Sequence, residues 1–163
     1  MPERKPAGRG VEVAIPGGKR PLRIEHVVFD FNGTLAVEGR LVRGVAARLK
    51  ALAAQAEVVV MTADTFGTAR QALAGLPVAV RIVRTGREKH RFVESLGAKG
   101  VAAVGNGTND VPMLRAAVLG IVVIGDEGTS GEAVRAADVV ARDINVAIDL
   151  LLKPQRLVAT LRK

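Results

Sequence analysis

The chain has 163 residues, of which 48% are hydrophobic, so it is long and apolar enough to bury the core of one domain. The absence of cysteine excludes disulfides, thiol catalysis and thiolate metal sites, and an aromatic content of 2% disfavours a base-stacking surface. The net charge of +8 lies in the ends: residues 1–24 hold six basic and two acidic residues, residues 153–163 hold four basic and none acidic, and residues 25–152 are neutral.

Basic ends can bind polyanions but are more often solvated tails, so nucleic acid is not expected to be the main partner. No apolar run reaches the roughly 18–20 residues that a membrane span needs, and the N-terminus lacks the apolar segment of a signal peptide. We therefore expect a cytoplasmic protein with no membrane partner. The two histidines stand apart, and we interpret His26 as a strand residue and His90 as a solvated helix residue.

Residues 1–10, rich in Pro, Gly and charge, are expected to form a disordered basic tail, and residues 11–25 predict a β-hairpin around Pro-Gly-Gly. Apolar strands and amphipathic helices then alternate up to residue 152. Strands are expected at 26–31, 57–62, 78–83, 100–105 and 119–125, and helices at 44–55, 65–76, 88–97 and 109–117, with segments 129–137, 138–141 and 144–152 completing the series. Residues 153–163 are expected to be a basic C-terminal tail.

This alternation predicts a single α/β domain over residues 11–152, with the hairpin at 11–25 and the core at 26–152. Its apolar strands predict a mostly parallel sheet covered by helices on both faces, a Rossmann-like three-layer α/β/α sandwich. In such a sheet the loops at the carboxyl ends of the strands form the functional sites.

Polar residues lie at two of these predicted strand ends. Asp30 ends the strand of VVFDFNGTL, and Gly33 and Thr34 follow in a tight loop. Its carboxylate suits a nucleophile or a metal ligand, or alternatively the cap of a turn. Thr62 ends the strand of VVVMTAD, where its hydroxyl can bind an anion or cap a helix.

Two further segments supply a cation and oxygen ligands. Lys89 begins the helix of GREKHRF, where it can reach a phosphate or simply lie on the surface. In VGNGTNDVPML, Asn106 and Asp110 offer oxygen atoms suited to Mg²⁺, and Gly105 and Gly107 allow close backbone approach.

Together these four segments resemble, in order and spacing, the haloacid dehalogenase superfamily of phosphatases and P-type ATPases. The motif DxxGT[LV] is matched by Asp30, Gly33, Thr34 and Leu35, and GDGxNDxPML is matched as GNGTNDVPML. Residues 119–144 are also similar to the phosphorylation domain of P-type ATPases. The resemblance covers roughly residues 24–152.

The resemblance implies a Mg²⁺-dependent phosphohydrolase that forms an aspartyl-phosphate on Asp30. It implies a metal site made by Asp30, the backbone carbonyl of Asn32, Asn106 and Asp110. The implied phosphate ligands are Thr62, Lys89 and the loop at Gly33 and Thr34, and the implied catalytic set is Asp30, Asn32, Thr62 and Lys89.

Two positions depart from the family pattern. Family phosphatases have a general acid/base Asp where this chain has Asn32, which cannot exchange a proton, so slow turnover is expected. Asn106 replaces a metal-binding Asp, which should weaken Mg²⁺ binding. The segments between the motifs are too short for a cap domain, which suggests a macromolecular phosphorylated substrate or closure by a second subunit in a homo-oligomer.

These departures leave an alternative open, namely a non-catalytic or regulatory module that binds phosphate and metal. A response-regulator receiver also uses an Asp, a Thr and a Lys on a parallel sheet. It requires an acidic pair after its first strand, whereas this chain has FDFNGT there. We therefore set the receiver aside.

Overall fold

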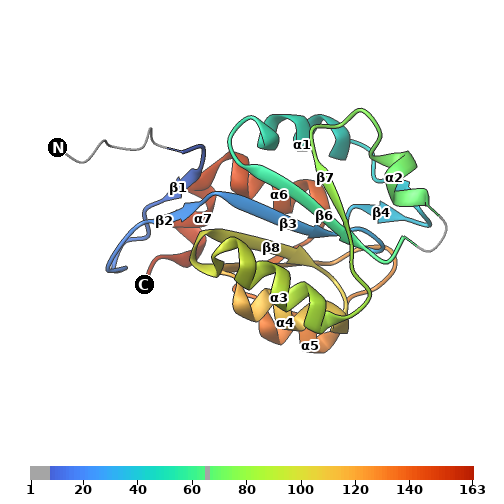
Figure 1. The fold of residues 1–163 in the computed structure, drawn as a ribbon. Coiled ribbons are helices and arrows are strands. Elements are labelled where there is room, and N and C mark those ends of the chain that lie inside the picture. Colours follow the sequence, from blue (N-terminus) through green and yellow to red (C-terminus); the bar gives the residue numbers. More distant parts are fainter. Residues whose placement is uncertain (1–7, 65–66) are drawn as a thin grey trace.

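A six-stranded parallel sheet forms the centre of the molecule (Figure 1). The computed structural model describes residues 8–64 and 67–163. The strands are β3 (His26–Asp30), β6 (Glu57–Thr62), β7 (Ala79–Ile82), β8 (Val101–Gly105), β9 (Leu119–Val123) and β10 (Val139–Ala141). Their order across the sheet is β10-β9-β8-β3-β6-β7, and every neighbouring pair is parallel. The predicted parallel sheet is confirmed.

Helices cover both faces of this sheet, which confirms the predicted three-layer architecture. They are α1 (Val45–Ala53), α2 (Thr68–Ala72), α3 (Gly86–Leu96), α4 (Val111–Ala116), α5 (Gly131–Ala136), α6 (Ile144–Leu152) and α7 (Pro154–Leu161), with short 3₁₀ turns η1 (Ala98–Gly100) and η2 (Thr108–Asp110). Helices α1 and α6 pack together on one face, and α3, α4 and α5 lie side by side on the other (Figure 1).

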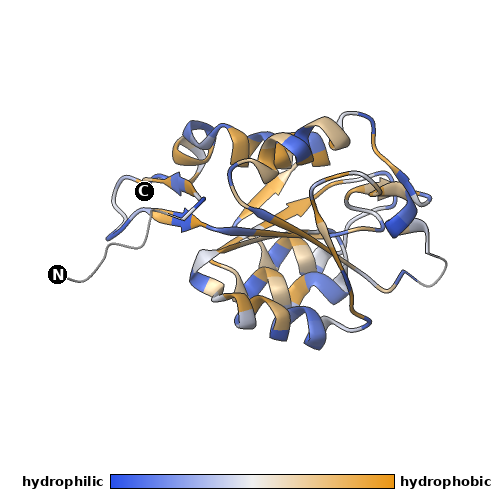
Figure 2. Cartoon of the chain, turned by 45° about the horizontal axis from the view of Figure 1, so that its top comes forward, coloured by the Kyte–Doolittle hydropathy of each residue, from blue (hydrophilic) through white to orange (hydrophobic). Residues whose placement is uncertain are grey.

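The central strands are apolar on both sides because both faces are covered. Along β3, Val27 and Phe29 pack in the core beneath α1 and α6, whereas Val28 packs in the core beneath α3 and α4. All three side chains are fully buried. Figure 2 shows the same pattern as hydrophobic strands between helices that are hydrophilic on their outer surfaces. The continuous apolar run in the sequence therefore reports a strand buried on both faces.

Two small hairpins flank the sheet. The expected N-terminal hairpin is present as β1 (Val11–Val13) paired antiparallel with β2 (Leu22–Ile24). A second hairpin, β4 (Ala36–Val37) with β5 (Arg40–Leu41), follows the Asp30 loop and was not predicted. Its turn residues Glu38 and Gly39 both have positive φ, at 51° and 77°, as a two-residue hairpin turn requires. The glutamate at the first position concealed this turn.

The C-terminus differs from the expected tail, since residues 154–161 form α7. Leu157 is fully buried, and Val158 and Leu161 pack against the same core. This helical spacing was obscured in the sequence by the charged residues around it.

The helix expected at 65–76 is reduced to α2, and the expectation for residues 65–66 lies outside the described residues. The same holds for residues 1–7 of the predicted N-terminal tail. None of the described helices is both long and apolar enough to span a bilayer.

One ion pair joins the two helices on the same face of the sheet. Arg48 of α1 donates from Nε to Oδ1 of Asp149 at 2.9 Å and from Nη2 to Oδ2 at 3.2 Å, and its Nη1 donates to the carbonyl of Gly44. Hydrogen bonding from Arg48 lowers the pKa of Asp149 below its ordinary value. The ionised carboxylate is thus favoured by folding.

We predict that Asp149→Asn lowers the free energy of unfolding at pH 7 by about 0.2–1 kcal/mol, which is a fall in Tm of roughly 0.5–4 °C. Because the pKa of Asp149 is lowered in the folded state, this contribution is present above the unfolded pKa of about 3.9 and disappears as pH falls through the folded value. Thermal unfolding followed by circular dichroism from pH 7 to pH 3 tests this. The exposed Asp126, which forms no ion pair among the described residues, supplies the control Asp126→Asn. A difference from wild type that did not shrink between pH 5 and pH 3 would contradict the assignment.

Candidate active site

Asp30 lies at the centre of the sheet edge where the carboxyl ends of the strands meet. It is the last residue of β3, which pairs with β6 on one side and β8 on the other. Strand β6 ends at Thr62, and the segment that follows β8 contains Asn106 and Asp110. The parallel topology therefore gathers residues that are far apart in the sequence.

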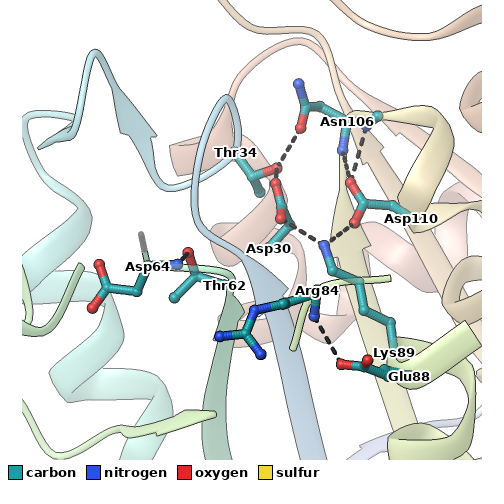
Figure 3. Close-up of polar contacts among 10 residues, drawn as sticks. Asp30, Thr34, Thr62, Asp64, Arg84, Glu88, Lys89, Asn106 and Asp110 are labelled. Atoms are coloured by element: carbon teal, nitrogen blue, oxygen red, sulfur yellow. Dashed lines mark hydrogen bonds and ion pairs between the residues drawn. The ribbon is translucent and has the colours of Figure 1, made fainter. Parts of the chain in front are cut away.

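Lys89 links this edge to helix α3 (Figure 3). Its Nζ lies 2.7 Å from Oδ1 of Asp30 and 2.7 Å from Oδ1 of Asp110. Only 2% of the residue is exposed, so the surface alternative for this lysine is excluded. Helix α3 starts two residues earlier than predicted, after the cap at Thr85, whose hydroxyl accepts from the Glu88 amide. Lys89 therefore lies on the first turn, directed into the molecule.

Asp110 fixes the loop between β8 and α4. Its Oδ2 accepts the backbone N–H groups of Asn106 and Gly107, both at 3.0 Å, while Oδ1 accepts from Lys89. The residue is completely buried. A Cβ on Gly105 would lie 2.6 Å from the Asp110 carboxyl, which explains the glycine before the loop. Both oxygens of Asp110 are thus occupied by N–H donors, and its predicted role as a direct metal ligand remains a prediction.

Thr34 joins Asp30 to Asn106. Its Oγ1 lies 3.2 Å from Oδ2 of Asp30 and 3.0 Å from Oδ1 of Asn106 (Figure 3). A hydroxyl has one proton, so it can donate to only one of these two acceptors at a time. Carboxylate and amide oxygens therefore converge here with an excess of lone pairs, a donor set that suits a hard cation.

The amide of Asn106 has a fixed orientation. Its Nδ2 donates to the carbonyl oxygen of Gly128 at 3.1 Å, and that carbonyl can only accept. The oxygen Oδ1 must therefore face Thr34. Gly33 has φ of +78°, and a Cβ there would overlap the Asn106 side chain. The glycine of the first motif makes room for the asparagine of the fourth.

Burial and charge set the protonation of the site. Burial and repulsion from Asp110 raise the pKa of Asp30 to about 6, against the opposing effects of Lys89 and Thr34. Burial by itself lowers the pKa of Lys89, but the carboxylates of Asp30 and Asp110 outweigh it and raise that pKa above its ordinary value. The lysine thus remains an ammonium, and two carboxylates share one positive charge.

A cavity of about 250 Å³ opens at this cluster. It is lined by Asp30, Asn32, Thr62, Ala63, Val83, Arg84, Lys89, Asn106, Gly107 and Asn109. Thr62 is buried, and its Oγ1 accepts the backbone N–H of Asp64 at 3.1 Å, which leaves the hydroxyl proton available. Asn32 is exposed at the rim. The cavity is large enough for a phosphoryl group and opens to solvent.

The structure therefore brings together every residue that the sequence singled out. One detail differs: the N–H groups of Gly33 and Thr34 donate to the carbonyls of Ala36 and Phe31, at 2.9 and 3.2 Å. These amides are used within the loop, so their predicted phosphate contacts remain a prediction. Among the described residues no cluster of three His, Asp or Glu side chains suited to a metal is present. Any cation would depend on amide and backbone oxygens as well.

Sequence reasoning missed Arg84, which lines the cavity from the segment after β7. Arg84 stands in a row of basic residues, and its position just beyond a predicted strand end was the available signal. Asp64 was also missed. Its carboxylate accepts the backbone N–H groups of Ala69 and Arg70 at 2.8 and 3.4 Å, so it caps α2.

Comparison with known proteins first gives a relative in sequence. No family model matches the chain. The chain is 52% identical over 64 residues to the uncharacterized protein MJ0073 of Methanocaldococcus jannaschii. The aligned segment covers 39% of this chain and 69% of that protein. The chain belongs to the same family as MJ0073.

Solved structures identify the fold. The 3-deoxy-D-manno-octulosonate 8-phosphate phosphatase of Moraxella catarrhalis, in complex with magnesium, phosphate and its sugar, superposes with a TM-score of 0.68 at 15% identity, over 83% of this chain and 90% of that one. The cobalt-bound enzyme of Haemophilus influenzae gives 0.67 at 17% identity, over 86% and 90%. A protein of Legionella pneumophila assigned to subfamily III A of the haloacid dehalogenase hydrolases gives 0.68 at 16% identity, over 84% and 86%. The chain is thus a member of the MJ0073 family with the fold of the haloacid dehalogenase superfamily.

Proposed function

We propose that this protein is a phosphohydrolase that transfers a phosphoryl group to Asp30 with the help of Mg²⁺. The observation that supports this best is the position of Asp30, a carboxylate at the floor of an open cavity between an ammonium and an oxygen-rich cluster. The fold agrees, since similar structures at this level of likeness include phosphatases.

In the proposed reaction a carboxylate oxygen of Asp30 attacks the phosphorus of a phosphate monoester. The new bond joins Asp30 to phosphorus, and the bond from phosphorus to the ester oxygen breaks in line with it. The leaving oxygen takes a proton from water, because the amide of Asn32 has no acidic proton that it could transfer. A water molecule then hydrolyses the acyl-phosphate, which releases phosphate and restores Asp30.

Lys89 and Thr62 have the chemistry to hold the phosphoryl oxygens. The Lys89 ammonium already touches Asp30 at 2.7 Å, so it can neutralise charge as the new bond forms. The hydroxyl proton of Thr62 is free to donate into the cavity, since its oxygen accepts from Asp64. Asp110 has a positioning role, because it accepts hydrogen bonds from Lys89 and from the loop of Asn106 and so holds both in place.

The oxygen cluster fits a divalent cation. Asp30 Oδ2 and Asn106 Oδ1 converge at Thr34, and Asn32 lines the same cavity. A bound Mg²⁺ would supply positive charge against the phosphoryl oxygens and would offset the excess negative charge of Asp30 and Asp110. That the similar structures hold magnesium or cobalt agrees with this proposal.

We predict that Asp30→Asn reduces Mg²⁺-dependent hydrolysis of para-nitrophenyl phosphate to the uncatalysed background, because the amide is a poor nucleophile. Release of para-nitrophenol measures this, with Asp126→Asn as a matched control that should retain activity. Wild type should also form a beryllofluoride adduct that Asp30→Asn does not. An adduct without turnover in wild type would indicate a phosphate-binding module in place of an enzyme.

We predict that Asn32→Asp accelerates turnover by about 10²-fold or more, since a carboxylic acid at this rim position can protonate the leaving oxygen. The gain should be larger for an alkyl phosphate than for para-nitrophenyl phosphate, whose leaving group needs little protonation. Measuring kcat for both substrates at pH 5–8 tests this. Equal gains for the two leaving groups would show that the introduced carboxyl group does not act as the acid.

We predict that Asn106→Asp makes the protein less stable without metal and more responsive to Mg²⁺. The new carboxylate cannot donate to the Gly128 carbonyl, which costs about 0.5–1.5 kcal/mol, but it adds a charge to the cation site. Thermal unfolding with increasing MgCl₂ measures both effects without reference to activity. The variant should have the lower Tm in EDTA and the larger Mg²⁺-induced rise. An unchanged Mg²⁺ response would remove Asn106 from the metal site.

A further inference from the structure

A concentration of arginine lies next to the proposed active site. From Arg70 to Arg91 the chain holds six basic residues and a single acid, Glu88, although residues 25–152 as a whole are neutral. The neutral sum in the sequence conceals this asymmetry. Four of these residues, Arg70, Arg81, Arg84 and Arg91, are exposed and come from α2, β7, the segment after β7, and α3.

Two hollows continue from the active cavity along β7. The first, of about 410 Å³, shares Ala63 and Arg84 with the active cavity and is also lined by Arg70. The second, of about 520 Å³, shares Arg70 with the first and is also lined by Arg81 and Arg91. The three hollows thus form one groove, which we call the arginine groove, with arginines at successive positions from the site outward.

The guanidinium groups of these four arginines have no anionic partner among residues 8–64 and 67–163, where none of them forms an ion pair or donates a hydrogen bond. The two acids that line the two outer hollows are engaged elsewhere. Asp64 caps the amides at the start of α2, and Glu88 accepts the backbone N–H of Arg84 at 2.8 Å. Figure 3 shows the Arg84 guanidinium directed away from Glu88.

The groove lies on the open edge of the sheet. Strand β7 is the last strand on its side, so no further strand covers it. Charged residues often protect such an edge from unwanted pairing. Edge protection accounts for Arg81 alone, because Arg70 and Arg91 reach the groove from helices on either side. Guanidinium groups suit phosphate through paired hydrogen bonds, and Arg81 is held in place over the Phe92 ring at 4.9 Å.

We propose that the substrate presents its phosphate monoester at the end of a chain of further phosphates, and that the arginine groove binds those phosphates. This proposal rests on the proposed function, because the terminal phosphate occupies the Asp30 cavity. Among residues 8–64 and 67–163, Phe92 is the one aromatic ring in the lining, so recognition by these residues depends on backbone phosphates. The open active site then needs no cap, since binding energy comes from the groove.

The test uses a series of substrates that carry the same 5′-phosphate on chains of increasing length, which we call the length ladder. The series consists of adenosine 5′-monophosphate and 5′-phosphorylated oligoadenylates of two, three and four nucleotides. We expect kcat/KM for release of the 5′-phosphate to rise about 3–10-fold for each of the first added phosphodiesters, and to level off when the chain outruns the groove. The rise should disappear at high salt. A flat ladder would overturn the proposal.

Variants localise the effect. Arg81→Glu combined with Arg91→Glu should flatten the ladder and leave hydrolysis of adenosine 5′-monophosphate and para-nitrophenyl phosphate unchanged. The control pair, Arg115→Glu combined with Arg135→Glu, makes the same change in net charge at exposed residues of α4 and α5 outside the groove, and should retain the ladder. Equal losses from both pairs would mean a general effect of charge and would overturn the proposal.

Binding separates this proposal from the proposed function. Anisotropy of a labelled 5′-phosphorylated tetranucleotide should detect binding to wild type, competition by inorganic tripolyphosphate, and loss of binding in the groove variant, even if no phosphate is released. Absence of hydrolysis with binding intact would refute the catalytic proposal alone. Tighter binding of a phosphoserine peptide flanked by acidic residues than of the tetranucleotide would overturn the assignment of a phosphate chain.

Discussion

The buried ammonium of Lys89 is the interaction on which the site depends. It lies 2.7 Å from both Asp30 and Asp110, which belong to different parts of the chain. Without it two buried carboxyl groups would lie side by side with no cation between them, and removing one partner of a buried ion pair typically costs about 3–5 kcal/mol. The same contact orients the carboxylate that we propose as the nucleophile and tethers α3 to the sheet edge. Stability and the proposed chemistry therefore depend on one side chain.

The two asparagines that depart from the family pattern have different physical consequences. Asn106 has a structural role that aspartate could not fill, because its Nδ2 donates to Gly128 and joins the loop after β8 to the loop after β9. Its oxygen is still available to a cation. Asn32 lies exposed at the rim, and no comparable contact explains it. Relative to aspartate, Asn106 lacks a negative charge and gains a hydrogen bond between two loops, whereas Asn32 lacks an acidic proton.

The open site and the proposed role of the arginine groove both concern how an uncovered cavity gains affinity for its substrate. A cavity without a covering domain cannot gain affinity by closing over a small substrate. An extended substrate can supply that affinity through contacts outside the cavity, where its binding energy positions the reacting phosphate. The edge strand β7 provides the space for such contacts, because it is the last strand of the sheet on its side in the part of the chain that the structure describes.

The sequence by itself determined the parallel α/β sheet and the residues that meet at its edge. Apolar strands report burial on both faces, and motif residues at strand ends must converge when all strands run the same way. Tertiary structure decided that Lys89 is buried. From sequence alone a lysine on the first turn of a helix is expected at the surface, and only the fold places Asp30 and Asp110 on either side of it. It also decided the docking of α7 through Leu157 and the gathering of arginines from three elements. Net charge and periodicity are sums along the chain, whereas burial and charge clusters depend on which segments the fold brings together.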